Sequence, residues 1–330
     1  MAEKIDLVLP WVDGCDHEWQ KQKSKYDSSV EENSGGANRY RDWDMLIYLF
    51  RGIEKFLPWV RKVHFITCGH LPDWLNTGCE KLNIVKHKDY IPDKYLPTFS
   101  SHPIELNMFR IDDLTEQFIY LNDDTFFTGP LEEKDFFVNG LPKDCALVAV
   151  HQFKKEIVDH IIANDLGVIN ENFNKFKSIF KNITKWFSLK YGKALIKNLY
   201  FLPTGNFVGF ELKHIPQAYL KSTLKEVWEK EYEVLDRTSS NKFRSRSDVN
   251  QWLFRYWQIA SGNFVPEKTN KGKFFIIGKD DGDIKQAIIQ QKYKMICLSD
   301  DIIDIDFESE KKKICSWFDE ILPNKSMFEK

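Results

Sequence analysis

The sequence lacks long apolar runs and an excess of charge of either sign. No stretch approaches the ~18 consecutive apolar residues of a membrane-spanning helix, so we expect no transmembrane segment. Lys and Arg total 47 against 49 for Asp and Glu, which gives a net charge of -2. Such a chain has no general attraction to nucleic acid or to an anionic membrane, although a local basic patch is compatible with these totals. We therefore expect no nucleic-acid partner.

The sequence also lacks closely spaced cysteines, and we expect no signal peptide. Its six cysteines are widely spaced and none belongs to a Cys-x-x-Cys pair, which excludes a zinc ribbon and a thioredoxin-type motif. The first residues, Met1 to Asp6, hold no apolar run of signal-peptide length. We expect six reduced thiols and a cytoplasmic location.

Several catalytic signatures are missing as well. There is no Gly-x-x-x-x-Gly-Lys phosphate loop, no Gly-x-Gly-x-x-Gly after a strand, no Gly-x-Ser-x-Gly elbow and no His-Glu-x-x-His. Aromatic residues, in contrast, are abundant: they make up 15% of the chain and include 26 Phe and 10 Trp. This content fits either a large aromatic core or platforms on which sugars stack, and composition does not separate the two.

The order of apolar segments predicts an α/β fold. Over residues 1–150, buried strands alternate with amphipathic helices, which is typical of a mostly parallel sheet covered by helices. We expect strands at residues 5–9, 63–67, 83–85, 118–121 and 146–150, and helices from Asp42 to Pro58 and near 104–111. Residues 151–266 have a mainly helical period and predict a helical subdomain. Residues 267–330 return to short strands and a helix, and predict a C-terminal α/β tail packed on the core.

The strongest local signal is an apolar strand that ends in two carboxylates, Asp123 and Asp124, directly after Asn122. Adjacent carboxylates at a strand end are costly unless a cation lies beside them, and carboxylate oxygens suit Mg²⁺ or Mn²⁺. A surface turn capped by Asn122 or Asp123 explains the same residues. From this motif alone the two interpretations carry equal weight.

Two further motifs lie near predicted helix starts. Asn38-Arg39-Tyr40-Arg41-Asp42 precedes the first long helix, where the arginines could receive a phosphate. Taken alone it reads more simply as a solvated basic turn. Ser100-Ser101-His102-Pro103-Ile104-Glu105 begins the second helix, with Glu105 on its first turn. His102 is an acid/base candidate, although a lone histidine at a helix start is more often structural.

A fourth motif is split along the chain. Lys213-His214-Ile215-Pro216 is followed thirty residues later by a segment in which Arg244 and Arg246 precede an aromatic helix. An arginine pair before a helix start is suited to an anion, but the residues alone read more simply as a charged loop.

Together these motifs resemble the Stealth family of sugar-phosphate transferases. Ile5-Asp6-Leu7-Val8 and Trp11-Val12-Asp13-Gly14 resemble its first block. The long second block resembles the residues from Asn38 through Leu96-Pro97-Thr98-Phe99-Ser100-Ser101 to Asp124, in family order. His214-Ile215-Pro216 is similar to part of the third block, and Arg244 with Asp248 to the segment that enters the fourth. The resemblance is strong to about residue 130 and thin over 151–200.

The resemblance implies a GT-A-like fold in which residues 1–150 bind a nucleotide sugar. It implies transfer of a hexose- or N-acetylhexosamine-1-phosphate from a UDP-sugar to a hydroxyl of a glycan acceptor, with release of UMP, in bacterial capsule or exopolysaccharide synthesis. The acceptor could be lipid-linked, which leaves open a peripheral association with the inner face of the membrane. Mg²⁺ or Mn²⁺ is the implied cofactor.

The resemblance also implies roles for individual residues. We expect catalytic roles for His214, Arg244, Glu105, Asp124 and Asp13, binding of the donor by Arg39, Asn38, Asn122, His102 and Arg246, and metal binding by Asp123 and Asp124. His214 is the first candidate for the general base, with Glu105 or Asp13 second. Arg244, with Arg39, would stabilise the charge on the transferred phosphoryl group.

The chain departs from the family pattern at Cys68-Gly69-His70, where members have Asn- or Asp-Gly-Gln. The identity of the sugar therefore stays open. Two other functions fit the same residues: a metal-dependent glycosyltransferase that releases UDP, and a non-catalytic carbohydrate-binding protein. Metal-dependent turnover of a donor would exclude the second.

Overall fold

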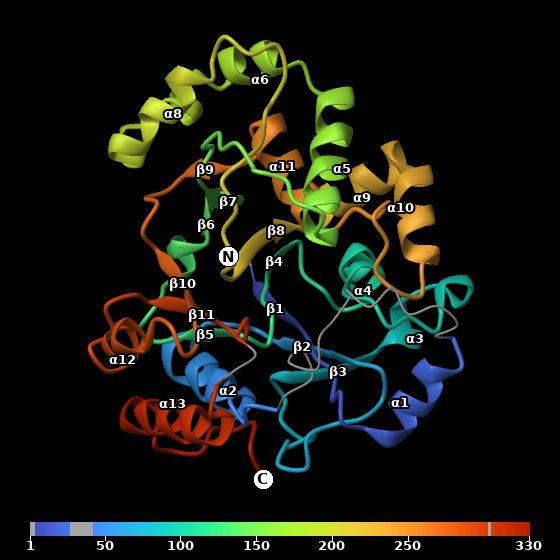
Figure 1. The fold of residues 1–330 in the computed structure, drawn as a ribbon, viewed down its shortest axis with the longest axis vertical. Coiled ribbons are helices and arrows are strands. Elements are labelled where there is room, and N and C mark those ends of the chain that lie inside the picture. The colour runs from blue at the N-terminus through green and yellow to red at the C-terminus, as the bar shows by residue number, and fades with distance from the viewer. Residues whose placement is uncertain (1–3, 27–41, 303–304) are drawn as a thin grey trace.

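A computed structural model describes residues 4–26, 42–302 and 305–330. Its central sheet has five strands in the order β3-β2-β1-β4-β8 (Figure 1). The first four run parallel and β8 is antiparallel to β4. The strands are β1 (Ile5–Pro10), β2 (Val63–Thr67), β3 (Leu82–Lys86), β4 (Gln117–Tyr120) and β8 (Gln217–Leu220).

The α/β class with a mostly parallel sheet, predicted from the sequence, is confirmed. The four predicted strands of this sheet form within one or two residues of their expected bounds because each is mostly apolar and can be buried on both faces. α2 (Leu46–Phe56) begins four residues after Asp42 and ends before Pro58. The order β3-β2-β1-β4 places the loops after β1 and β4 side by side at one edge of the sheet.

Two smaller sheets complete the strand framework. β5 (Thr125–Phe127) pairs with β11 (Met295–Ser299), which pairs in turn with β10 (Gly272–Ile276). The other joins β6 (Phe137–Val138), β7 (Leu141–Asp144) and β9 (Val265–Pro266). α12 (Asp281–Ile289) and α13 (Phe307–Ile321) belong to the tail, and α13 packs near α2 (Figure 1).

One predicted strand, residues 146–150, is wrong. The strand ends at Asp144, and beyond it only an isolated bridge joins Val148 to Phe210. Side chains of the helical region take the hydrogen bonds that a neighbouring strand would supply: Ala146 N donates to the Tyr191 hydroxyl and Val148 N to Asn198 Oδ1. A buried apolar segment therefore stays irregular.

Residues 157–261 are mainly helical, as predicted, but β8 interrupts them and joins the central sheet. The helices there are α5 (Ile157–Asn172), α6 (Lys175–Lys181), α7 (Ile183–Trp186), η5 (Leu189–Ala194), α8 (Leu195–Tyr200), α9 (Lys221–Lys230), α10 (Tyr232–Ser240) and α11 (Trp252–Ser261). Shorter elements in the first half are α1 (His17–Ser24), α3 (His87–Tyr90), η2 (Asp93–Tyr95), α4 (Ser101–Leu106), η3 (Met108–Arg110) and η4 (Glu133–Asp135). The domain boundaries predicted near residues 150 and 266 stay predictions.

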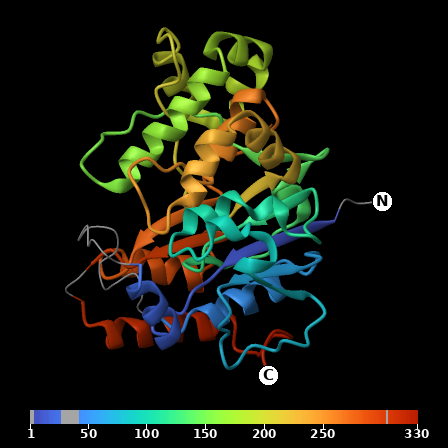
Figure 2. The ribbon, with the colours of Figure 1, turned by 90° about the vertical axis from the view of Figure 1, so that its right-hand side faces the viewer.

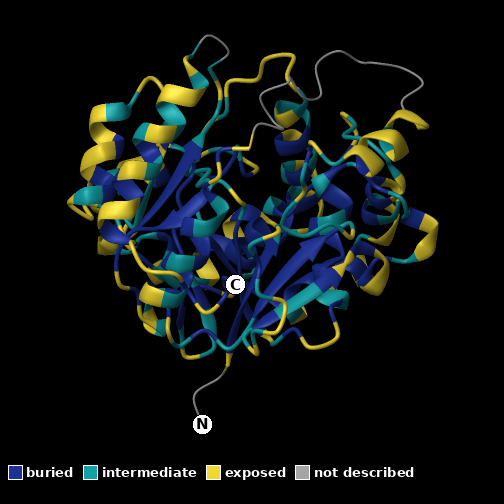
Figure 3. Ribbon diagram, turned by 90° about the horizontal axis from the view of Figure 1, so that it is seen from below, coloured by how far each residue is buried: buried dark blue, intermediate teal, exposed yellow. Residues whose placement is uncertain are grey.

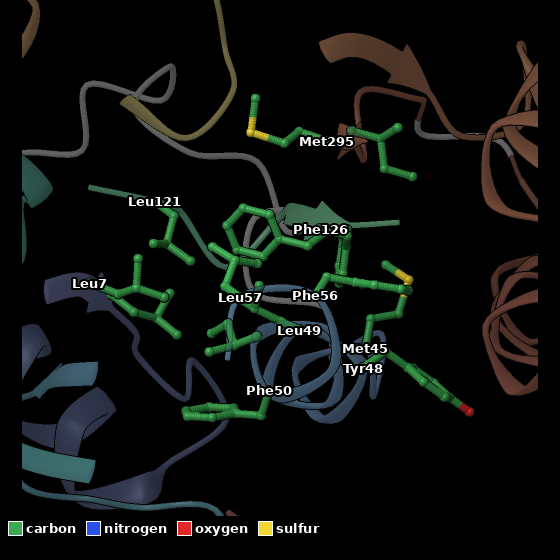
Figure 4. Close-up of a cluster of buried hydrophobic side chains, with 14 of the residues drawn as sticks. Leu7, Met45, Tyr48, Leu49, Phe50, Phe56, Leu57, Leu121, Phe126 and Met295 are labelled. Carbon is green, nitrogen blue, oxygen red and sulfur yellow. The ribbon is translucent and has the colours of Figure 1, made fainter. Parts of the chain in front are cut away.

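The two faces of the central sheet carry two separate apolar cores. Leu7 of β1 and Ile119 of β4 face a cluster that includes α2, Phe126 and α13 (Figure 4). The alternate residues, Val8 and Phe118, face a second cluster built with the helical region. Figure 3 shows the strands buried between exposed outer helix faces. In the described ranges, no helix has the length and apolar character needed to cross a bilayer.

A buried ion pair ties the helical region to the strands. Arg255 of α11 donates from Nε and Nη2 to the two carboxylate oxygens of Asp144, at 2.7 and 2.8 Å. Arg255 Nη1 also donates to the carbonyl oxygen of Glu211, at 2.7 Å. Because Glu211 lies shortly before His214, this pair helps to fix the segment that leads to the candidate site.

Candidate functional site

The candidate site lies beyond the carboxyl ends of β1 and β4, where ligands bind in open α/β sheets. Asp13 follows β1, and Asn122, Asp123 and Asp124 fill the short connection from β4 to β5. In this turn, the backbone N–H and side-chain hydroxyl of Thr125 both donate to the Asn122 carbonyl oxygen, at 3.1 and 2.7 Å. The chain reverses tightly here and presents its polar side chains at the edge of the sheet.

Asp124 meets two residues from distant parts of the chain. His214 Nε2 lies 3.3 Å from Asp124 Oδ2. One ligand atom each from Asp124, His214 and Cys297 lies within 4.8 Å of the other two. The other carboxylate oxygen of Asp124, Oδ1, is buried and has no hydrogen-bond partner among the described residues. The site therefore combines a carboxylate, an imidazole and a thiol, and one oxygen of that carboxylate lacks a hydrogen-bond partner among the described residues.

The C-terminal tail brings Cys297 to this position. β11 pairs antiparallel with β5 so that Cys297 is opposite Thr125, and Leu298 N donates to the Asp124 carbonyl oxygen at 2.9 Å. The neighbouring Ile296 and Leu298 point into the core around α2, while Cys297 belongs to neither apolar core. The Cys297 thiol thus lies beside the Asp124 carboxylate.

Charge interactions at the site shift the pKa of two candidate residues. Desolvation opposes protonation of His214, but the Asp124 carboxylate outweighs it and raises the pKa of His214 above 6.5. Desolvation by the surrounding protein and repulsion from Asp124 raise the pKa of Asp123 to about 7. Because the side chain of Asp123 is exposed to solvent, repulsion from Asp124 is the stronger of the two causes. Excess negative charge at this edge favours a bound cation.

A hydrogen-bonded chain links His214 to α4. Asn122 Nδ2 lies 3.1 Å from His214 Nε2, and the Tyr120 hydroxyl donates to Asn122 Oδ1 at 2.6 Å. The same hydroxyl is 3.1 Å from Glu105 Oε1, and the other oxygen of Glu105 accepts from Gln251 N. Four of the predicted residues, Glu105, Asn122, Asp124 and His214, therefore belong to one connected arrangement.

Arg244 approaches the same helix one turn earlier. Its Nη2 donates to the hydroxyl of Ser101, four residues before Glu105 on α4, at 3.1 Å. Residues four apart share a helix face, so Arg244 and Glu105 border one side of the site. Arg246 is exposed farther along the same loop, and its carbonyl oxygen accepts from Asn164.

His102 supports the Arg244 loop instead of facing solvent. It is 3% exposed, and its Nδ1 lies 2.8 Å from Asp248 Oδ2. Asp248 also accepts from Ser245 N and Asn241 Nδ2, at 2.9 and 2.6 Å. The structure thus indicates a positioning role for His102, and the donor contact expected from the sequence stays a prediction. The physical reason is that the buried Asp248 carboxylate needs this partner.

Asp13 stands on the neighbouring loop. Its backbone N–H donates to His70 Nε2 at 2.7 Å, and its carboxylate accepts from Cys15 N. The departure from the family pattern at His70 thus contacts a predicted site residue. Asn38 and Arg39 lie outside the described residues.

Sequence reasoning missed Cys297 and Tyr120. Cys297 lies within an apolar strand far from Asp124 in the chain, and no spacing rule connects the two. Tyr120 reads as a core strand residue, and its hydroxyl is part of the site only because β4 ends there. The alternation of side chains along β4 could have indicated Tyr120, because it lies on the same face of the strand as Phe118.

The side chains that could bind a metal ion can be compared with the ligand preferences of the implied cations. Two adjacent carboxylates, Asp123 and Asp124, fit Mg²⁺ or Mn²⁺ together with phosphate oxygens of a substrate. The set Asp124, His214 and Cys297 contains nitrogen and sulfur and fits a thiophilic ion such as Zn²⁺ better. Both sets include Asp124, whose buried Oδ1 has no partner among the described residues. The residues therefore fit a cation at Asp124.

The fold and site define an α/β protein with a polar, metal-compatible site at the carboxyl edge of its sheet. Family models for Stealth protein conserved regions 1 and 2 match residues 3–31 and 39–144. The chain is 42% identical over 330 residues to a capsular polysaccharide phosphotransferase WcwK of Streptococcus pneumoniae, covering 99% of this chain and 98% of the relative. The chain belongs to the Stealth family.

Other similar proteins carry related names. A receptor polysaccharide phosphotransferase WefC of Streptococcus gordonii is 42% identical, over 100% of this chain and 100% of its own. An exopolysaccharide phosphotransferase cps2G of Lactiplantibacillus plantarum is 36% identical over 99% of this chain and 96% of its own. A solved WbbM bifunctional glycosyltransferase matches at 11% identity with a TM-score of 0.35, over 97% of this chain and 51% of that one.

Proposed function

We propose that this protein transfers a sugar-1-phosphate from a UDP-sugar to a hydroxyl of an acceptor glycan, forming a phosphodiester and releasing UMP. One observation carries the proposal: in a chain related over its full length to named polysaccharide phosphotransferases, His214 meets Asp124 at the carboxyl edge of the sheet. Capsule or exopolysaccharide synthesis is the corresponding process.

The reaction needs an acceptor oxygen to attack the phosphorus next to the sugar. An oxygen–phosphorus bond forms there, and the bond from that phosphorus to the bridging oxygen of UMP breaks. His214 is the proposed base, which takes the acceptor proton when its imidazole is neutral. Asn122 Nδ2 lies 3.1 Å from Nε2, the same ring nitrogen that lies 3.3 Å from Asp124 Oδ2. Glu105 and Asp13 stay the second candidates.

Positive charge must balance the transferred phosphoryl group. Arg244 would stabilise its oxygens, held by Ser101 and by the Asp248 loop. A Mg²⁺ or Mn²⁺ ion held by Asp123 and Asp124 would supply further neutralisation of the diphosphate. Phosphoryl transfer depends mainly on such positioning and charge stabilisation.

The proposal also includes a cytoplasmic location and a glycan as the acceptor. This glycan could be linked to a lipid. Both follow from the expected activity: UDP-sugars are the donors, and the relatives' names refer to polysaccharides. The sugar that is transferred stays open.

The test is turnover with a panel of UDP-sugars, Mg²⁺ or Mn²⁺ and a glycan acceptor, with the released nucleotide identified by chromatography. We expect UMP. Substitution of His214, Arg244 or Asp124 by Ala should lower the rate by roughly 10²–10⁴-fold. The matched control Arg237→Ala, an exposed arginine on α10, should leave the rate unchanged. Near-wild-type rates in all three folded site variants would overturn the residue assignments.

UDP as the released nucleotide would instead support the second candidate, a metal-dependent glycosyltransferase. In that case the sugar alone moves and no phosphorus enters the glycan. Binding of glycans without metal-dependent turnover of any donor would support a carbohydrate-binding protein.

A further inference from the structure

Residues 175–200, the segment from α6 to α8, carry an unusual charge. They contain seven lysines and neither Asp nor Glu, in a chain whose net charge is -2. Lys175 is buried and Lys185 is partly buried. The exposed lysines of the segment are Lys177, Lys181, Lys190, Lys193 and Lys197. Positive charge is therefore concentrated here although the whole chain is nearly neutral.

The same segment displays large apolar side chains to solvent. Leu189 is 89% exposed, Tyr200 77% and Ile196 70%. The other exposed large apolar residues of the segment are Phe176, Phe180, Ile183 and Leu199. Scattered single residues of this kind are ordinary on a protein surface, but a cluster marks an interaction site.

This surface is built on a well-packed frame. Trp186 and Tyr191 are buried, and Asn198 Nδ2 donates to the carbonyl oxygens of Ala146 and Trp186, both at 2.7 Å. Lys175 Nζ donates to the carbonyl oxygens of Phe201 and Thr204, at 2.6 and 2.8 Å. The exposed apolar residues therefore belong to a segment whose other face already has a core.

The segment also stands at one end of the molecule. Figures 1 and 2 show α6 and α8 at the end opposite α2 and α13, seen from two directions. A broad flat partner could reach this end without meeting the tail.

We propose that residues 175–200 form a docking surface for an anionic lipid bilayer. Lysines beside exposed aromatic and aliphatic side chains are the combination that binds the interface of such a membrane. Charge complementarity selects the occupant: Lys177, Lys181 and Lys193 have no ion pair among the described residues. Lys197 is paired with Glu211 at 3.2 Å and contributes less.

The biological use of this membrane contact rests on the proposed function. The binding of lipid by residues 175–200 does not. A transferase held on a membrane would meet a lipid-linked acceptor in two dimensions. Lipid binding and sugar-phosphate transfer can therefore fail separately.

Sedimentation of the full chain with lipid vesicles tests the proposal. We expect binding to phosphatidylglycerol-containing vesicles at low salt, much weaker binding to pure phosphatidylcholine, and weaker binding as salt rises, with a fraction that stays bound through the apolar side chains. The triple variant K177Q/K181Q/K193Q should bind about 100-fold more weakly. A matched control, K88Q/K225Q/K285Q, removes three exposed lysines from α3, α9 and α12 and should bind like the wild type.

A second variant, L189S/I196S, tests the apolar part. It should retain the salt-sensitive attraction and lose much of the bound fraction at higher salt. Equal binding by the site and control triple variants would overturn the proposal, as would no binding of the wild type to anionic vesicles. A dimer that L189S/I196S abolishes, without vesicle binding, would assign the surface to a second copy of this chain.

Turnover with a short water-soluble acceptor separates this proposal from the proposed function. The variants of residues 175–200 should keep that turnover, because none of them touches the site. Vesicle binding without turnover in the wild type would contradict only the transferase proposal.

Discussion

At the scale of single residues, the contact between Asp124 and His214 dominates the candidate site. The 3.3 Å separation of Oδ2 and Nε2 couples the charge of one residue to that of the other. The pair could not be read from the sequence, where the two residues lie in separate motifs. The family resemblance named both, and the fold places them together.

This coupling predicts a pH effect. Asp124 raises the pKa of His214, so Asp124→Asn should lower that pKa, leaving desolvation to favour the neutral ring. NMR titration of the His214 ring in protein free of divalent cations would measure the shift, with His214→Gln used for assignment. The exposed control Asp73→Asn should leave the titration unchanged. An unshifted His214 in Asp124→Asn would show that the carboxylate does not control the imidazole.

The thiol beside this pair leads to a second prediction. Burial and the neighbouring Asp124 raise the pKa of Cys297 far above its ordinary value, so the free thiol is protonated. A thiophilic ion would displace that proton. Zn²⁺ or Co²⁺ should therefore bind at Asp124, His214 and Cys297, and Cys297→Ser should weaken binding by roughly tenfold or more.

Calorimetry with Zn²⁺ and the near-ultraviolet thiolate absorption of bound Co²⁺ would measure this binding without any assay of turnover. Cys315→Ser is the matched control, because that cysteine lies elsewhere and contacts the Trp43 carbonyl oxygen. The absorption should disappear in Cys297→Ser and persist in Cys315→Ser. Identical spectra in both variants would remove Cys297 from the ligand set.

At the scale of elements, the strands were the most predictable part. Ile5–Leu9 and Val63–Thr67 are apolar runs long enough for a strand and bounded by turn residues, so local pattern and tertiary burial agree. Residues 146–150 have the same pattern, but side chains of Tyr191 and Asn198 satisfy their backbone. Such long-range hydrogen bonds leave no trace in local sequence, which is why that prediction was wrong.

The loop that carries Arg244 gives a prediction about stability. His102→Ala would leave the buried Asp248 carboxylate without its 2.8 Å partner and should cost about 1.5–3 kcal/mol. Urea unfolding would measure the loss. Ser247→Ala changes an exposed residue of the same loop and should alter the free energy of unfolding by less than about 0.5 kcal/mol. Equal effects of the two substitutions would contradict a positioning role for His102.

At the scale of the whole molecule, a buried charge cluster anchors the start of the sheet. Asp6 on β1 accepts from Arg61 Nε at 2.7 Å and from Thr115 N at 3.0 Å, and it lies 3.0 Å from His64 Nε2. Desolvation raises the pKa of Asp6, but the hydrogen bonds outweigh it and lower that pKa to about 2. The carboxylate is therefore stabilised in the folded protein.

This shift predicts how stability depends on acid. The folded pKa lies below the unfolded value of 3.8, so the contribution is present above pH 3.8 and is lost as the pH falls toward 2. It amounts to about 2 kcal/mol at neutral pH. Asp6→Asn should be less stable than the wild type at pH 7, and the difference should shrink between pH 4 and 2. A difference that does not change with pH would contradict this account.

The whole-molecule arrangement was only partly predictable. Alternation of strands and helices indicated a parallel sheet, and the tail was expected to pack on the core. The tail does more than that: β11 pairs with β5 and supplies Cys297 to the site. Pairing between strands so far apart in the chain depends on the assembled core, and local periodicity does not encode it.

In the proposed reaction, the phosphate next to the sugar moves with the sugar. A UDP-sugar labelled at that phosphate, incubated with the enzyme, a divalent cation and a glycan acceptor, tests this directly. We expect the label to appear in the glycan and unlabelled UMP to be released. Label found in released UDP, with none in the glycan, would contradict it.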